Sequence, residues 1–239
     1  MLYVSVHIPK TAGTSFAKAL GQAFEEDELV LDYRHARDHA ELAARGVGAL
    51  ETHRAWLSPG WLDLARRYRQ DINALPKGCK LVHGHFPVRK YHPLMTWRKP
   101  FYITWVRDPF ARAVSNYFYW QSFDPEHMPD PLVRTVLSDR WSLEDFLFHP
   151  ALQNYQSLFL RGVPWQRIDF IGVVERFPED LKKLSAMIGR PLEQFMENTG
   201  PVSGAVETHE HLRAHFMEFH EEDTALYHYA VDRSKRAQN

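Results

Sequence analysis

The sequence predicts an α/β fold in which a central, mostly parallel sheet is flanked by helices. Short apolar segments rich in β-branched residues alternate with helical patterns, which is the order expected when crossover helices join parallel strands. Residues 101–106, Phe-Tyr-Ile-Thr-Trp-Val, are almost continuously apolar, which is typical of a strand buried on both faces. A length of 239 residues is enough for one sizeable core, so we expect a single domain over residues 1–239.

Four segments have the apolar, β-branched character of strands. In chain order they are Leu2–His7, Lys80–His83, Phe101–Val106 and Phe170–Val174. A turn and then a helix follow the first of them directly. Because ligands of parallel sheets bind at the carboxyl ends of the strands, the residues after these segments are the first candidates for a functional site.

Helical patterns fill most of the intervening chain. They cover Ser15–Phe24, Ala36–Arg45, Gly60–Gln70, Pro109–Tyr119, Leu143–Phe148, Glu179–Ile188 and a tail over Glu207–Tyr229. The segment Gln121–Asp139 is rich in Asp and Pro, so we expect a long loop there. Loops of that size are often functional lids.

Composition excludes several classes of protein. A formal net charge of −1 argues against a broadly basic nucleic-acid binder, and the single cysteine, Cys79, excludes an internal disulfide or a Cys-rich zinc site. No apolar run approaches the ~20 residues of a membrane span, and the N-terminus lacks a signal-peptide pattern. We therefore expect a cytoplasmic protein with no membrane span and no nucleic-acid partner. The neutral total nevertheless conceals a basic stretch, because residues 83–117 carry six basic residues against one acidic residue.

The segment after the first strand is suited to an anion. It runs from His7 to Phe16 as His-Ile-Pro-Lys-Thr-Ala-Gly-Thr-Ser-Phe. A glycine permits a tight turn, three hydroxyl residues and the amides of a helix N-terminus can donate hydrogen bonds, and Lys10 adds a cation. It is neither a Walker A loop nor a Gly-x-Gly-x-x-Gly loop. The alternative is a simple turn in which a Thr or Ser caps the following helix.

A second basic motif follows the strand at 101–106. Arg107 comes at the carboxyl end of that strand, Asp108 is placed to cap the next helix, and Pro109 suits its first position. Arg112 and Ser115 lie one and two turns into the helix. A guanidinium fork with a hydroxyl suits a phosphate, whereas the alternative is a surface helix with ordinary arginines.

Together the two motifs resemble the donor-binding signatures of sulfotransferases that use 3′-phosphoadenosine 5′-phosphosulfate (PAPS). The resemblance implies a P-loop-like sulfotransferase fold in which Arg107 and Ser115 hold the 3′-phosphate. It also implies that Lys10 reaches the bridging oxygen of the phosphosulfate and that no metal is needed. The implied loop contacts to the 5′-phosphosulfate come from Lys10, Thr11, Ala12, Gly13, Thr14, Ser15 and Phe16.

A pair of histidines offers a candidate base. His83 and His85 flank Gly84 at the end of the second predicted strand, and alternation along a strand places both side chains on the same side. An imidazole can take a proton from an alcohol near neutral pH, whereas the alternative is a hydrogen-bonded pair beneath a loop. The His-Gly-His segment resembles that of the uronyl 2-O-sulfotransferases of heparan and dermatan sulfate. This resemblance implies His85 as the catalytic base, with His83 assisting or binding the acceptor, and a carbohydrate hydroxyl as the acceptor.

Two other functions remain open on the sequence. A P-loop kinase or NTPase would bind ATP with Mg²⁺, although the absence of Gly-Lys-Ser/Thr argues against it. A non-catalytic protein on the same fold would bind the nucleotide without turnover. The presence of Lys10, Arg107, Ser115 and both histidines argues against such a loss of activity.

Overall fold

A computed structural model describes residues 1–33, 61–92, 94, 98–128, 130–194 and 202–236. Its centre is a five-stranded parallel sheet with the strand order β2-β3-β1-β4-β5. The strands are β1 (Tyr3–Val6), β2 (Leu29–Leu31), β3 (Leu81–Gly84), β4 (Phe101–Val106) and β5 (Phe170–Val173). The predicted α/β class with a parallel central sheet is confirmed.

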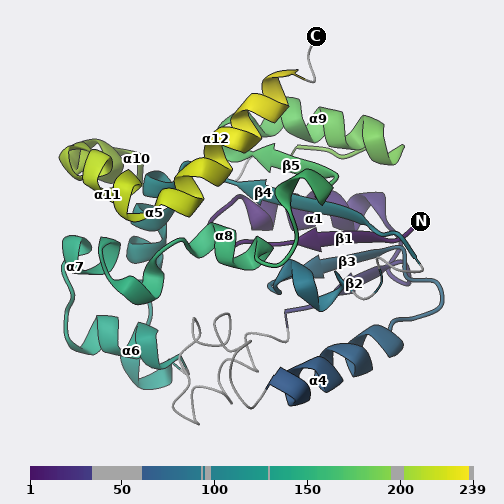
Figure 1. Cartoon of the computed structure of the whole chain (residues 1–239), viewed down its shortest axis with the longest axis horizontal. Coiled ribbons are helices and arrows are strands. Elements are labelled where there is room, and N and C mark those ends of the chain that lie inside the picture. The colour runs from purple at the N-terminus through teal and green to yellow at the C-terminus, as the bar shows by residue number, and fades with distance from the viewer. Residues whose placement is uncertain (34–60, 93, 95–97, 129, 195–201, 237–239) are drawn as a thin grey trace.

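Helices surround this sheet and continue beyond one of its ends (Figure 1). The helices that precede β5 are α1 (Gly13–Ala23), α4 (Trp61–Asn73), α5 (Pro109–Trp120), α6 (Pro131–Ser138), α7 (Leu143–Leu147) and α8 (Tyr155–Leu160). Those that follow β5 are α9 (Phe177–Ile188), α10 (Val202–Thr208), α11 (Arg213–Phe219) and α12 (Glu221–Arg236). No helix in the described part of the chain is long and apolar enough to cross a membrane.

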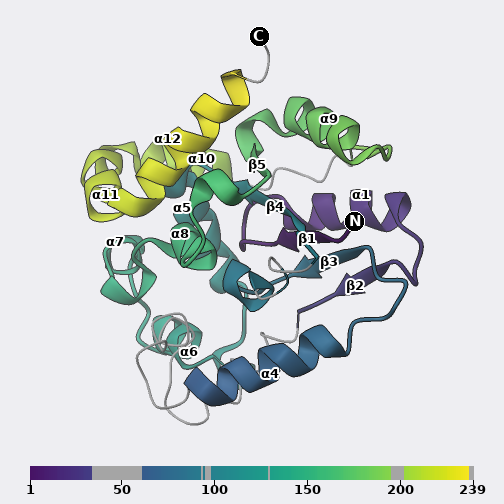
Figure 2. The ribbon, with the colours of Figure 1, turned by 45° about the vertical axis from the view of Figure 1, so that its right-hand side comes forward.

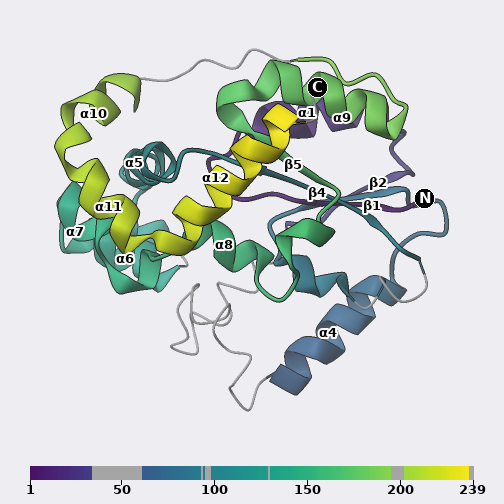
Figure 3. The same cartoon turned by 45° about the horizontal axis from the view of Figure 1, so that its top comes forward.

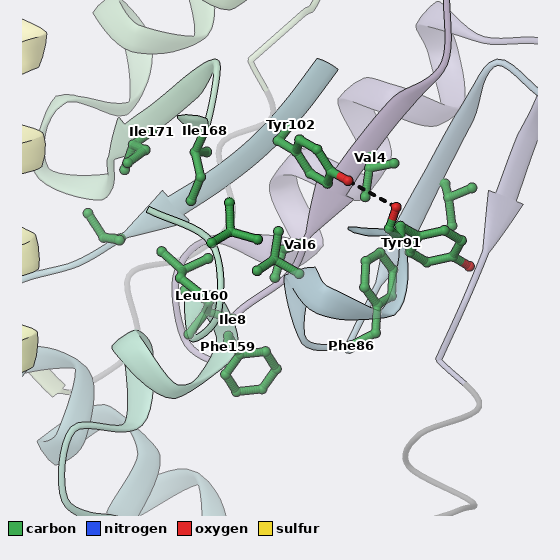
Figure 4. Packing of buried hydrophobic residues seen from close by; sticks show 14 of the residues in the cluster. Val4, Val6, Ile8, Phe86, Tyr91, Tyr102, Phe159, Leu160, Ile168 and Ile171 are labelled. Atoms are coloured by element: carbon green, nitrogen blue, oxygen red, sulfur yellow. Dashed lines mark hydrogen bonds between the residues drawn. The ribbon is translucent and has the colours of Figure 1, made fainter. Parts of the chain in front are cut away.

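Alternation along the strands sends apolar side chains to both faces of the sheet. On one face Phe16 of α1 and Leu184 of α9 pack against Ile103 and Trp105 of β4. On the other face α4, α8 and α12 cover a second cluster, in which Phe159 of α8 lies with residues of β1 (Figures 3 and 4). Burial on both faces explains why β4 is apolar along its length.

A third apolar cluster holds the helices beyond the carboxyl ends of the strands. It joins α5, α6, α7, α8 and α11, and its fully buried members include Phe110, Val136, Phe146 and Phe216. These helices lie together at the left of Figure 1 and remain together when the molecule is turned (Figure 2). These helices lie next to the carboxyl ends of the strands, where the candidate site is found.

The predicted continuous loop over Gln121–Asp139 is wrong in its second half. The structure places α6 there, because Asp130 accepts hydrogen bonds from Leu132 N (2.9 Å) and Val133 N (3.4 Å) and so caps the helix. Pro131 occupies the first position of the helix, where a missing N–H costs nothing. The apolar side of α6 then packs on the third cluster through Val136.

The other differences are smaller. Strand β2 was not predicted, and the tail predicted as one helix over Glu207–Tyr229 divides into three helices with breaks near residues 209–212 and 220. All four predicted strands are present as β1, β3, β4 and β5, and so are the helices predicted near Ser15, Gly60, Pro109, Leu143 and Glu179. Their ends differ from the prediction by up to three residues. The helix predicted over Ala36–Arg45 lies outside the described residues.

Candidate functional site

The loops after β1, β3 and β4 leave the same edge of the sheet side by side. Val6, the last residue of β1, pairs with Gly84 at the end of β3 and with Thr104 near the end of β4. The sheet order puts β1 between these two strands. Both predicted basic motifs and the His-Gly-His segment are therefore brought to one edge, where parallel sheets bind ligands.

The loop after β1 has an unusual backbone. Lys10 (φ 69°) and Ala12 (φ 60°) both adopt the left-handed conformation without being glycine. Each such residue costs of order 1–2 kcal/mol, and backbone strain of this kind concentrates at functional sites. The buried hydroxyl of Thr11 donates to the carbonyl of Ile8 (2.8 Å) and fixes the turn.

Helix α1 begins at this loop without a side-chain cap. Its N-cap residue is Ala12, and no side chain accepts a hydrogen bond from its first turn in the described part of the chain. No acidic residue lies in that turn. The alternative prediction of a capping Thr or Ser is therefore wrong, and the first amides of α1 remain directed at the space before the helix.

The other predicted loop residues differ in their exposure. Thr14 is exposed, Ser15 is half-buried and Gly13 is buried. Phe16 is 1% exposed, packs edge-on against Trp105, and donates its N–H to the carbonyl of Ala12. Because the Phe16 amide is already used within the helix, Phe16 does not offer it to a ligand. Its ring packs under the loop against the sheet.

Lys10 lies beside a second cation. The Arg107 guanidinium reaches the carbonyl of Lys10 at 3.5 Å, and the Lys10 ammonium lies 4.2 Å from the ring centroid of Tyr119. Burial lowers the pKa of Lys10, and the positive charge of Arg107 lowers it further. Among the described residues neither cation forms an ion pair with a carboxylate. Two adjacent cations without a paired anion favour binding of an anionic ligand.

The backbone of Arg107 is held from both sides by one amide. Gln156, which is fully buried in α8, accepts a hydrogen bond from Arg107 N (3.0 Å) and donates one to Arg107 O (2.9 Å). Asp223 of α12 in turn accepts from Gln156 N (2.9 Å). The carboxyl-terminal helix therefore determines where Arg107 stands, a contact that sequence reasoning missed.

The next residue, Asp108, caps α5 as predicted, and Pro109 is the first residue of the helix. The Asp108 carboxylate accepts from Ala111 N (2.8 Å), and Nη1 of Arg213 in α11 contacts both of its oxygens, each at 2.8 Å. Its own N–H donates to Glu175 (3.0 Å), and burial raises the pKa of Glu175. Asp108 is thus occupied structurally rather than pointing into the site.

The surface-helix alternative for α5 is wrong. Arg112 is 2% exposed, with its guanidinium 4.6 Å from the ring of Tyr155, and Ser115 is 6% exposed. Burial lowers the pKa of Arg112, an effect that Asp223 opposes. The Nε and Nη1 atoms of Arg112 have no hydrogen-bond partner among the described residues. Buried donors of this kind are expected to meet water or an ion.

The two predicted histidines belong to a larger cluster. His83 is 1% exposed, and its Nδ1 lies 2.8 Å from the hydroxyl of Ser5, the residue that pairs with it in β1. The ring of His7 stacks on His83 (centroids 5.3 Å apart) and lies 4.3 Å from His85. His83 and His85 therefore point to the same side of the sheet, as predicted.

His7 and Tyr33 are members of this cluster that sequence reasoning missed. The Tyr33 hydroxyl lies 3.2 Å from His7 Nδ1, and the Tyr33 ring contacts His85 edge-on at 4.9 Å. Alternation along β1 places Ser5 and His7 on one side, but only the register with β3 reveals that His85 lies beside them.

Burial keeps the rings of His7 and His83 neutral. Burial lowers the pKa of His7 to about 2, with further contributions from His85 and His83, and burial lowers the pKa of His83 to about 3. His85 is half-buried, whereas His83 is enclosed. The ring of His85 is therefore the more accessible of the two, although its Nε2 atom is buried as that of His83 is.

Two glycines let the histidine segments approach their neighbours. A Cβ on Gly13 would lie 1.5 Å from Nε2 of His7, so the imidazole edge rests directly on the start of α1. A Cβ on Gly84 would lie 1.8 Å from the carbonyl oxygen of Asp32. The predicted reason for Gly84, room between the two histidines, is thus corrected: the space admits the end of β2.

A buried ion cluster fixes that end of β2. Lys90, 1% exposed, contacts Asp32 at 2.7 Å and Asp71 at 2.6 Å, and Tyr91 donates to Asp32 at 2.8 Å. The N–H of Asp32 donates to the carbonyl of His83 (2.8 Å). Because Tyr33 follows Asp32, this cluster positions Tyr33 against the histidine rings.

The site combines hydrogen-bond donors and cations with a cluster of imidazole rings. The amides of α1, Lys10 and Arg107 suit phosphate or sulfate oxygens, and His85 is the candidate base among the three histidines, because burial disfavours the protonated forms of His7 and His83. The residues therefore suit a ligand that carries anionic oxygens. Within the described residues no group of three or more His, Cys, Asp or Glu side chains is arranged to hold a metal ion.

Comparison with known proteins adds little to this description. No protein-family model matches the chain. A protein of Archaeoglobus fulgidus, described as uncharacterized, is 32% identical to it over 91 residues. The match covers 36% of this chain and 66% of that protein, so the chain spans just under two thirds of the relative's length.

Proposed function

We propose that the protein is a sulfotransferase that moves the sulfuryl group of PAPS to a hydroxyl of a carbohydrate. The observation that carries this proposal is the pair of cations, Lys10 and Arg107, which lie beside the uncapped start of α1 and form no ion pair with a carboxylate among the described residues. Glu175 and Asp108 act on Arg107 only from a greater distance, where their charges oppose the lowering of its pKa by burial. Such a site attracts a small molecule with several anionic groups. His85, in the histidine cluster beside it, supplies the base that the transfer requires.

The basic groups come from two segments of the chain, and a donor with phosphates at two positions would use both segments. Lys10 and the amides of Gly13 and Thr14 lie on the loop after β1, whereas Arg107 and Ser115 lie on the segment after β4. A 5′-phosphosulfate on the first set and a 3′-phosphate on the second would use both. This division agrees with the resemblance of the two motifs to the donor-binding signatures of sulfotransferases.

In the proposed reaction the acceptor oxygen attacks sulfur in line with the bond to the bridging oxygen. The new O–S bond forms as the bond between sulfur and the bridging oxygen breaks, and the electron pair of the broken bond stays on the phosphate. His85 takes the proton of the acceptor hydroxyl. Lys10 and the α1 amides stabilise the charge that develops on the departing phosphate oxygen.

His83 assists His85 indirectly in this proposal. Burial keeps His83 neutral, so that the proton accepted by His85 does not meet an existing positive charge on its neighbour. The products are a sulfate ester and adenosine 3′,5′-bisphosphate. No step requires a redox change or an additional reactant.

The test is transfer of radioactive sulfate from labelled PAPS to a panel of oligosaccharides, with phenols, lipids and peptides as other acceptor classes. We expect labelled sugar with the wild-type chain and no transfer with His85→Ala, while the affinity for adenosine 3′,5′-bisphosphate stays nearly unchanged. The matched control is His228→Ala in α12, outside the described histidine cluster, which should retain activity. Full activity of His85→Ala would refute the base assignment, and labelling of another acceptor class alone would refute the carbohydrate.

A further inference from the structure

The side chain of Lys10 is held in place by a single aromatic ring. Its ammonium lies 4.2 Å from the centroid of Tyr119 in the last turn of α5. No other hydrogen bond or ion pair of this ammonium is present among the described residues. A cation at this distance from a ring face is attracted by the ring quadrupole.

The position of the ammonium requires such a partner. Arg107 lies close enough for its charge to lower the pKa of Lys10, so the two cations repel each other. Lys10 also has a long, flexible side chain with much rotamer freedom to lose, and the solvent is accessible to it because it is half-buried. Without the ring, repulsion and side-chain entropy would both favour a Lys10 that swings away from Arg107 into water.

Resting on the proposed function, we propose that Tyr119 is a positioning residue that holds the Lys10 ammonium over the donor loop before the donor arrives. Tyr119 acts through Lys10 and not by contact with the reacting atoms. The ring reduces the entropy that Lys10 would otherwise lose on binding the donor. Tyr119 lies outside the three buried core clusters and is 48% exposed, and within the described part of the chain its ring has one aromatic neighbour, Phe123, which it meets edge-on.

Its neighbour Phe118 provides a matched control. Phe118 is also an exposed aromatic residue of α5, at 40%, and its ring packs edge-on against Tyr117 instead of Lys10. Removal of either ring takes away a similar amount of exposed apolar surface from the same turn. Only removal of Tyr119 takes away the partner of the ammonium.

The test is a double-mutant cycle on binding of adenosine 3′,5′-bisphosphate, measured by isothermal titration calorimetry with the full chain. Tyr119→Leu should weaken binding by about 2- to 5-fold, as expected for a partly exposed cation–π contact. Tyr119→Phe keeps the ring and should bind as the wild type does. Phe118→Leu should also bind normally, and in a Lys10→Ala background Tyr119→Leu should have no further effect.

The outcomes separate this inference from the proposed function. If the wild type binds the bisphosphate but Tyr119→Leu binds as tightly, or weakens binding equally in the Lys10→Ala background, Tyr119 does not act through Lys10. If Phe118→Leu weakens binding as much as Tyr119→Leu, the effect is structural and the inference is wrong. If the wild type binds no bisphosphate, the proposed function fails and this inference fails with it.

Discussion

Replacement of Lys90 by methionine tests the reasoning about the buried ion cluster. Met is close to Lys in length but carries no charge, so Lys90→Met leaves Asp32 and Asp71 without the ammonium that lies 2.7 and 2.6 Å from them. Removal of one partner of a buried ion pair typically costs about 3–5 kcal/mol. The cost comes from Asp32, which is fully buried and cannot regain water. Because Asp71 is 24% exposed and can regain water, we expect the lower end of this range, about 3 kcal/mol.

For a chain of this length each kcal/mol corresponds to about 2–4 °C in the melting temperature, so Lys90→Met should melt about 6–12 °C below wild type. Thermal unfolding followed by circular dichroism measures the shift. The control is Arg161→Met, which removes an ion pair with Glu222 whose side chains are 43% and 48% exposed. An exposed pair contributes about 0–1 kcal/mol. Equal shifts for the two variants would refute the assignment of Lys90 as the anchor of β2.

Three further predictions follow from the site. Between about pH 6.5 and 3 the unfolded chain binds a proton at His83 that the folded chain excludes, so the free energy of unfolding falls as the pH falls. His83→Gln should therefore reduce the slope of the unfolding free energy against pH by up to about 1.4 kcal/mol per pH unit. Urea unfolding from pH 7 to 5 measures this slope. An unchanged slope would contradict the buried neutral state. Gly13→Ala should destabilise the protein by about 1–3 kcal/mol through its clash with His7, whereas Gly21→Ala, with open space around its Cβ in the same helix, should stabilise it by about 0.5–1 kcal/mol; similar melting temperatures would oppose this account. Gln156→Leu should cost about 1–3 kcal/mol by removing both hydrogen bonds to the Arg107 backbone, and should weaken binding of adenosine 3′,5′-bisphosphate; normal affinity in calorimetry would show that the amide does not position Arg107.

Local sequence signals predict those parts of the fold that depend on local physics. Strand β4 was predicted with its observed bounds, because burial on both faces makes residues 101–106 apolar without a break. The start of α5 was predicted from another local signal, a capping residue, Asp108, followed by Pro109. The equivalent signal at Asp130 and Pro131 was not used, although it caps α6 in the same manner. The sequence therefore contains the signal that contradicts the predicted loop in its second half.

Other parts depend on contacts between distant segments. Strand β2 has only three residues at the sheet edge, and Leu31 is 56% exposed, so it lacks the apolar pattern of a buried strand. Membership of His7 in the histidine cluster depends on the register of β1 with β3, which no local pattern specifies. The contact between Lys10 and Tyr119 joins residues more than one hundred positions apart. Such pairs become visible only when the fold brings the strand ends together.

The proposed donor gives the central claim its most direct test. Calorimetry should compare adenosine 3′,5′-bisphosphate with ATP and Mg²⁺, using the wild-type chain and Arg107→Ala. We expect the wild type to bind the bisphosphate in preference to ATP, and Arg107→Ala to bind the bisphosphate more weakly because the proposed contact to the 3′-phosphate is lost. Tighter binding of ATP with Mg²⁺, or an affinity for the bisphosphate that Arg107→Ala leaves unchanged, would contradict the assignment of this site to a 3′-phosphoadenosine donor.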